Sequence, residues 1–209
     1  ILALKVCDPA CGSGHFLIAA AHRLAKALAS VETHEDEPAP DAVRAALRKV
    51  IGGCLYGVDL NPMAVELCKV NLWMEALEPG KPLTFLDHHI QCGNSLLGTT
   101  PALMLRGIPD DAFQPIGGDD RGYVTALHKR NREERRGQTS LDAQAATVVA
   151  PPVDYAALAT GMREIDQIPD HMLSGIGRKE MEYRTLAASP EYQKAELLAD
   201  AWCAAFVWE

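Results

Sequence analysis

The sequence lacks a long uncharged apolar run and a leader-like start. Charges interrupt its apolar stretches well before the roughly 20 residues that a membrane span needs. No basic start followed by an apolar core and a cleavage site opens the chain. Internal repeats and long low-complexity tracts are absent as well. We therefore expect a cytoplasmic protein with no membrane partner, and its 209 residues suffice for one domain with a substantial core.

A paired-cysteine pattern is also missing. The chain has six cysteines, scattered through apolar contexts and with no CxxC pair, namely Cys7, Cys11, Cys54, Cys68, Cys92 and Cys203. Reduced core thiols fit this spacing better than a disulfide framework or a zinc site. His88 and His89 are adjacent, but no third ligand is spaced near them. We interpret the pair as two incidental histidines at the start of a strand, and we predict no metal site.

Basic residues are fewer than acidic residues in this chain. The formal net charge is -8, which opposes non-specific attraction to a phosphate backbone, so any contact with DNA must be local. Basic residues concentrate between Arg121 and Arg136, where Glu133 and Glu134 interrupt them. This run predicts a solvated helix face, with contact to DNA phosphates as the alternative.

The first hundred residues begin with a strand and a helix. Ile1–Cys7 is short, almost entirely apolar and followed by a turn signal, which predicts a buried parallel strand. From Gly14 onwards the pattern changes to that of a helix. Its predicted buried stripe consists of Phe16, Ala20, Leu24 and Leu28.

Two more strands and two more helices follow. Asp41 is the predicted N-cap of a helix that ends at Gly52-Gly53, and a strand is expected at 54–58. Asn61 is the expected cap of a helix whose first residue is Pro62. A third strand is expected at 88–92. Strands separated by helices imply parallel pairing with right-handed crossovers.

The predicted fold class is therefore α/β, with half of a doubly wound sheet in residues 1–100. After Thr100 the strand signals fade, and residues 101–209 predict a mostly helical insertion. Helices are expected at 121–136, 155–168 and 172–186, and a last one is expected to start at Ser189-Pro190.

The turn after the first strand carries the clearest chemistry. Gly12 and Gly14 let the backbone pass close to a ligand, and the following helix offers unpaired N–H groups with partial positive charge. The third glycine of the dinucleotide fingerprint is missing, since Leu17 stands in its place. Asp59 ends the second predicted strand, where a carboxylate can accept both ribose hydroxyls of an adenosine.

Three stretches together resemble a known family. Asp8–Gly14 (DPACGSG), with Phe16-Leu17 shortly after, resembles motif I of S-adenosylmethionine-dependent DNA adenine-N6 methyltransferases, particularly the large restriction-modification and phage-defence enzymes. Leu55–Pro62 (LYGVDLNP) and Gln91–Gly98 (QCGNSLLG) resemble their motifs II and III in the same order. The resemblance covers roughly the first half of the chain and implies a Rossmann-like methyltransferase fold with S-adenosyl-L-methionine as cofactor.

The resemblance also implies roles for single residues. Asp8 suits the ammonium of the cofactor's methionine end, backbone amides near Gly12 and Gly14 suit its carboxylate, and Asp59 suits the ribose. Asn94 is expected at the adenine amino group, with an ordinary turn residue as the alternative. The implied cofactor-binding residues are Asp8, Pro9, Ala10, Gly12, Gly14, Phe16, Asp59, Leu60, Asn94 and Leu96.

The family's catalytic motif, Asn or Asp followed by Pro-Pro and an aromatic residue, is not in the sequence. The only Pro-Pro pair, Pro151-Pro152, has neither the amide before it nor the aromatic after it, which predicts a linker. The chain also opens on Ile1 within an apolar run. We therefore expect a fragment that is inactive alone, from an enzyme whose full-length form acts on double-stranded DNA.

Two other functions remain open at this point. A nicotinamide-dependent oxidoreductase shares the strand, the glycine loop and the ribose acid, but its pyrophosphate needs a positive field, whereas Asp8 suits a cationic ligand. A non-catalytic helical interaction module is favoured by the missing catalytic motif and the large second half. Against it, the three cofactor motifs are chemically intact.

Overall fold

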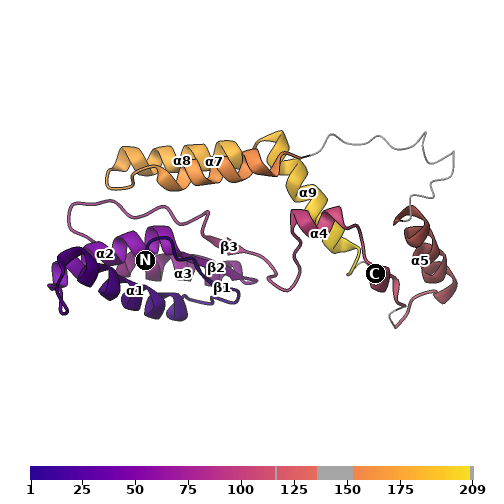
Figure 1. Cartoon of the computed structure of the whole chain (residues 1–209), viewed down its shortest axis with the longest axis horizontal. Coiled ribbons are helices and arrows are strands. Elements are labelled where there is room, and N and C mark those ends of the chain that lie inside the picture. Colours follow the sequence, from indigo (N-terminus) through magenta and orange to yellow (C-terminus); the bar gives the residue numbers. More distant parts are fainter. Residues whose placement is uncertain (116, 136–152, 208–209) are drawn as a thin grey trace. The chain divides into compact units, whose positions relative to one another are not determined.

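The computed structural model describes residues 1–115, 117–135 and 153–207 (Figure 1). These residues fall into two compact units, one formed by residues 1–96 with 159–188 and the other by residues 97–158 with 189–209. The predicted linker at Pro151-Pro152 and the basic residue Arg136 lie outside the described residues.

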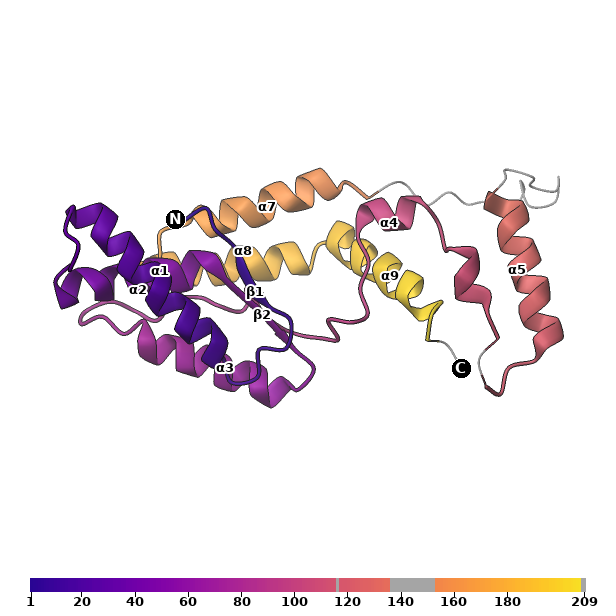
Figure 2. The same cartoon turned by 60° about the horizontal axis from the view of Figure 1, so that its bottom comes forward.

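The first unit contains a sheet of three parallel strands, in the order β1 (Val6–Asp8), β2 (Leu55–Asp59) and β3 (Ile90–Cys92). Figure 2 shows β1 and β2 side by side, and Val6 pairs with Leu55 while Asp59 pairs with Cys92. The prediction of an α/β fold with three parallel strands is thereby confirmed. Because the strands are parallel, Asp8, Asp59 and Cys92 all end at the same edge of the sheet.

The first strand is much shorter than the predicted Ile1–Cys7. Its pairing begins at Val6, because the partner Leu55 is the first residue of β2 and the chain before it belongs to helix α2 (Pro40–Cys54). Residues before Val6 thus have no neighbouring strand to pair with. The Leu4 N–H instead donates to the Ile1 carbonyl at 2.9 Å, which closes a turn.

Helix α1 (His15–Thr33) matches its predicted buried stripe only in part, since Leu28 is buried and Ala20 and Leu24 pack partly buried against the core. The buried side chains are Leu17, Ala21, Ala25, Leu28 and Ala29, whereas Phe16 is 61% exposed. Leu17 sets this phase because it packs over β2. A Cβ atom placed on Gly57 of β2 would lie 3.1 Å from the Leu17 Cδ1 atom. The prediction that Phe16 faces the core was wrong.

Helix α2 differs from its prediction at both ends. Its N-cap is Ala39, and Asp41 lies inside the helix, where its carboxylate pairs with the Arg44 guanidinium at 2.9 Å. The helix does not stop at the glycine pair but continues to Cys54. Gly52 is needed there for close packing, since a Cβ atom on it would lie 2.9 Å from the Thr84 methyl group.

Helix α3 (Pro62–Glu75) begins as predicted. The Asn61 side-chain oxygen accepts a hydrogen bond from the Met63 N–H at 3.0 Å, and Pro62 occupies the first turn. The helix contributes Val65, Cys68 and Leu72 to the core between α1, α2, α3 and the sheet.

Helices α7 (Tyr155–Gln167) and α8 (Leu173–Ala187) come late in the chain, yet their residues from 159 onwards belong to the first unit. They form a hairpin (Figure 1), in which a Cβ atom on Gly161 would lie 3.4 Å from Leu186. The Arg48 guanidinium of α2 donates to the Asp170 carbonyl at 2.8 Å and to the Pro82 carbonyl at 2.6 Å. The hairpin is therefore fastened to the sheet-bearing part of the chain.

The described elements of the second unit are helical. They are α4 (Pro101–Leu105), a short 3-10 helix η1 (Asp110–Phe113), α5 (Arg121–Arg135) and α9 (Pro190–Ala204). The predicted start of α9 is confirmed, because the Ser189 hydroxyl accepts from the Tyr192 N–H at 3.2 Å. None of the helices in the described part of the chain has the length and apolar character to cross a membrane.

Helix α5 carries most of the basic run. Arg130 is 74% exposed and pairs with Glu134 at 2.9 Å, one turn further along the helix. Lys129 lies 3.9 Å from Glu133 in the same arrangement. Lys129 and Arg130 thus have the solvated character that the sequence predicted for this face, and each also pairs with a glutamate one turn along.

Candidate functional site at the carboxyl edge of the sheet

Asp59 lies at the end of β2 and organises the carboxyl edge of the sheet. Its Oδ2 atom accepts the Gly12 N–H at 2.8 Å, and its Oδ1 atom accepts the Asn61 N–H at 2.9 Å. The hydrogen bond from Asn61 has the larger effect and the one from Gly12 the smaller, and together they hold the pKa of the Asp59 carboxyl below its ordinary value. A carboxylate has about four acceptor positions, so Asp59 retains capacity for two more hydrogen bonds.

The glycine turn is fixed to β2 and α3 by its backbone. The Cys11 N–H donates to the Val58 carbonyl at 3.0 Å, and the Gly14 N–H donates to the Cys11 carbonyl at 2.8 Å. Gly14 has φ +88°, and a Cβ atom on it would lie only 2.8 Å from the Cys68 sulfur of α3. Only glycine fits both this conformation and this approach. Gly12 has φ +53° with open space around it.

Thiols lie behind this turn. Burial raises the pKa of the Cys68 thiol to about 12 and also raises the pKa of the Cys11 thiol, so both are neutral and poorly nucleophilic near neutral pH. All six cysteines are free, as predicted. The expectation that they are core residues holds for Cys11, Cys54 and Cys68, whereas Cys7 and Cys92 are exposed.

The remaining polar residues of the predicted site lie at the ends of the outer strands. The carboxylate of Asp8, the last residue of β1, accepts the Ala10 N–H at 3.1 Å, while Pro9 and Ala10 are exposed. The exposed Asn94, after β3, accepts the Leu96 N–H at 3.0 Å. This bond is the local turn geometry expected if Asn94 is an ordinary turn residue. It uses only the side-chain oxygen, so the amide N–H₂ group of Asn94 remains available for a further hydrogen bond.

The segments of the three motifs meet at this edge through Asp59. Its side chain binds the glycine turn, and its carbonyl accepts the Gly93 N–H at 2.9 Å, just before Asn94. Three apolar side chains of the predicted site are left open to solvent, because Phe16, Leu60 and Leu96 are 61%, 71% and 91% exposed. Contact between these residues and a cofactor stays a prediction.

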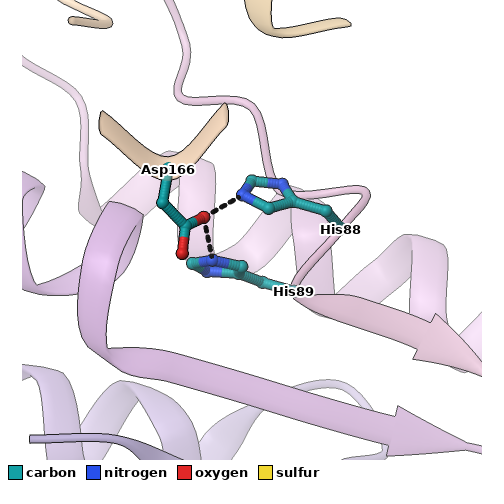
Figure 3. Close-up of side chains that lie close together, drawn as sticks. All are labelled: His88, His89 and Asp166. Atoms are coloured by element: carbon teal, nitrogen blue, oxygen red, sulfur yellow. Dashed lines mark hydrogen bonds and ion pairs between the residues drawn. The ribbon is translucent and has the colours of Figure 1, made fainter. Parts of the chain in front are cut away.

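A second cluster lies near the amino end of β3 and consists of His88, His89 and Asp166 (Figure 3). Both imidazoles face one oxygen of the Asp166 carboxylate, which comes from α7. The adjacent histidines are the only signal in the sequence. Asp166 lies too far along the chain for any spacing rule to connect it with them.

Comparison with known proteins agrees with the motifs. Residues 1–84 match the family described as the MmeI DNA-methyltransferase domain. A protein of Methanocaldococcus jannaschii named as a type II restriction enzyme and methyltransferase is 36% identical over 104 residues, which is 46% of this chain and 9% of that protein. The adenine-specific methyltransferase PglX of Streptomyces coelicolor is 36% identical over 105 residues, which is 45% of this chain and 8% of that protein.

These matches confirm the resemblance to adenine-specific DNA methyltransferases that the three motifs predicted. The chain spans less than a tenth of the length of each of these relatives. No solved structure matches the chain significantly.

Proposed function

We propose that this chain is the S-adenosyl-L-methionine-binding part of an adenine-specific DNA methyltransferase of a restriction-modification or defence system. The observation that carries the proposal is the hydrogen bond of 2.8 Å between the Gly12 N–H and the Asp59 carboxylate. It brings the motif I turn against the motif II acid at the carboxyl edge of a parallel sheet. In open α/β folds, ligands bind at this edge.

Each end of the cofactor has a suitable group. Asp8 suits the methionine ammonium. The Gly12 and Gly14 N–H groups already donate to Asp59 and to the Cys11 carbonyl, so the N–H groups of the first turn of α1 beside them suit the methionine carboxylate. The two remaining acceptor positions of Asp59 match the two ribose hydroxyls. The Asn94 side chain suits the adenine amino group, and Leu60 and Leu96 offer apolar surface to the ring. The cofactor supplies a methyl group on a sulfonium, which is already a good leaving group.

The proposed fold is Rossmann-like, with β1, β2 and β3 as part of its sheet. Residues 1–100 form the cofactor-binding half, and residues 101–209 form a mostly helical insertion. Because the sequence contains no catalytic motif of this family, the chain binds cofactor but does not methylate DNA alone. Double-stranded DNA is then a partner of the complete enzyme, acting in the cytoplasm.

Calorimetric titration of the chain with S-adenosyl-L-methionine and with NAD⁺ tests this proposal. We expect saturable binding of S-adenosyl-L-methionine that excess NAD⁺ does not displace. Binding of NAD⁺ alone would replace the proposal with the oxidoreductase alternative. No heat with either compound at millimolar concentration would favour the interaction module and contradict the proposal.

A further inference from the structure

The cluster near the amino end of β3 has the geometry of a ligand set. The His88 Nε2 atom lies 2.9 Å and the His89 Nε2 atom 3.3 Å from the same oxygen, Asp166 Oδ1. All three atoms lie within 4.8 Å of one another (Figure 3). In a tetrahedral site with bonds of about 2.0–2.1 Å, ligand atoms are about 3.3 Å apart. The cluster is therefore already close to the size of one coordination sphere.

The two histidine side chains are held rigidly inside the protein. Each is only 1% exposed, and the Asp166 side chain is 34% exposed. The His89 ring packs 4.2 Å from the Tyr56 ring, and the His88 ring stacks 5.2 Å from the Phe85 ring, measured between centroids. The aromatic neighbours fix the ring orientations, and Asp166 forms the side of the cluster that solvent can reach.

Hydrogen bonds alone satisfy this cluster poorly. Asp166 Oδ1 serves both rings, while the Nδ1 atoms of His88 and His89 are buried without a hydrogen-bond partner among the described residues. A buried polar atom without a partner is costly. The hydrogen bonds to Asp166 therefore leave this cluster incompletely satisfied, and a metal–nitrogen bond at each Nε2 atom would be a stronger interaction than the hydrogen bond it replaces.

The chemistry of the donor atoms also suits a metal ion. One carboxylate oxygen and two imidazole nitrogens, each of which offers a lone pair once its proton is released, converge on one place.

We propose that His88, His89 and Asp166 bind one Zn²⁺ ion through the two Nε2 atoms and Oδ1. Two imidazoles and one carboxylate are ligands typical of zinc, whereas Mg²⁺ and Ca²⁺ select oxygen ligands. Water on the exposed side of Asp166 completes the coordination. The ion joins helix α7 to the segment before β3 and so fastens the α7–α8 hairpin to the sheet, independently of the cofactor site.

The test uses the whole chain, stripped of metal with a chelator and then titrated with Zn²⁺, and with Co²⁺ as a spectroscopic probe. We expect one ion per chain and Co²⁺ absorption bands of a four- or five-coordinate site. Saturation with Zn²⁺ to about 100 times its dissociation constant should raise the melting temperature by about 5–10 °C. Asp166→Asn, which keeps the side-chain shape, should lower zinc affinity at least about tenfold.

The matched control is His22→Ala. His22 also faces a carboxylate, Glu75, at 2.8 Å, but as a single exposed histidine. This variant should bind zinc as the original chain does. The far-ultraviolet circular dichroism of Asp166→Asn separates loss of ligation from loss of fold. The proposal is overturned if the original chain binds no Zn²⁺ at micromolar concentration, or if folded Asp166→Asn binds it unchanged.

Discussion

Asp59 and Asp166 lie near opposite ends of the strands, and each accepts hydrogen bonds from two nitrogen donors. Asp59 divides its donors between two oxygens, and both donors are backbone N–H groups. Asp166 receives both of its donors on one oxygen, and both are imidazole nitrogens. The difference lies in the donors, because a backbone N–H always carries its proton, whereas an imidazole nitrogen can give its proton up.

The two ends of the strands are therefore suited to different ligands. The carboxyl edge is a backbone-built site, with a permanent anion and fixed donors, which suits a nucleoside with hydroxyl and amino groups. The cluster near the amino end is built from side chains whose nitrogens become metal ligands once deprotonated. Backbone geometry should be critical at the first, and side-chain identity at the second.

The largest expected effect comes from Gly14→Ala. The change places a Cβ atom 2.8 Å from the Cys68 sulfur in a left-handed conformation. It should lower the free energy of unfolding by about 2–5 kcal/mol, from strain of about 1–2 kcal/mol and overpacking of about 1–3 kcal/mol. Urea denaturation measures it.

Gly80→Ala is the matched control for the strain of the left-handed backbone conformation without overpacking. Gly80 has a similar φ of +80°, but nothing lies within 4 Å of its Cβ position. Its loss should be limited to about 1–2 kcal/mol. Equal losses in the two variants would show that the turn does not depend on its contact with α3.

Asp59→Ala should weaken the binding of S-adenosyl-L-methionine about ten- to a hundredfold, because a charged hydrogen bond contributes about 1.5–3 kcal/mol. Zinc binding should be unaffected. Asp166→Asn should show the reverse pattern, with cofactor binding intact. Calorimetry of both variants with both ligands measures this, and loss of both ligands from either variant would mean that the two sites are not separate.

Lys179→Met should stabilise the protein by about 1 kcal/mol. The Lys179 side chain in α8 is buried, with 3% of the residue exposed, and this burial lowers its pKa from 10.5 despite Asp170 and Asp166. Between the lowered value and 10.5 the unfolded chain binds more protons, so stability should rise with pH in that window. Lys26→Met, at an exposed position, is the control in urea denaturation. A less stable Lys179→Met would show that the buried ammonium is favourable.

The smallest expected effect concerns pH at the carboxyl edge. Because backbone donors lower the pKa of Asp59 below 3.8, its stabilising contribution is present above that value and is lost as the pH falls through the folded pKa. Cofactor affinity should therefore change less than about twofold between about pH 8 and 5. A steep loss of affinity over this range would assign the ribose contact to another group.

Short-range signals predicted the parts of the fold whose cause is local. Asn61 and Pro62 predicted the start of α3, and Ser189 predicted the start of α9, because a capping residue and the helix that it begins are neighbours in sequence. The parallel pairing of the three strands followed from their alternation with helices.

Features that depend on distant partners escaped prediction. β1 begins where Leu55 provides a pairing partner. Position 52 is glycine because Thr84 packs closely against it, and the buried face of α1 is determined by its packing over Gly57. The carboxyl-edge residues could be named from their motifs, but the bond from Gly12 to Asp59 needed the folded chain. Asp166 could not be named at all, because its role arises from helix α7 packing near β3.

The most direct test is a crystal structure of the chain with S-adenosyl-L-methionine. The account predicts the nucleoside at the carboxyl edge of the sheet, with the ribose hydroxyls on Asp59 and the methionine end beside the turn from Gly12 to Gly14. A cofactor bound elsewhere, or a ribose that makes no contact with Asp59, would contradict it.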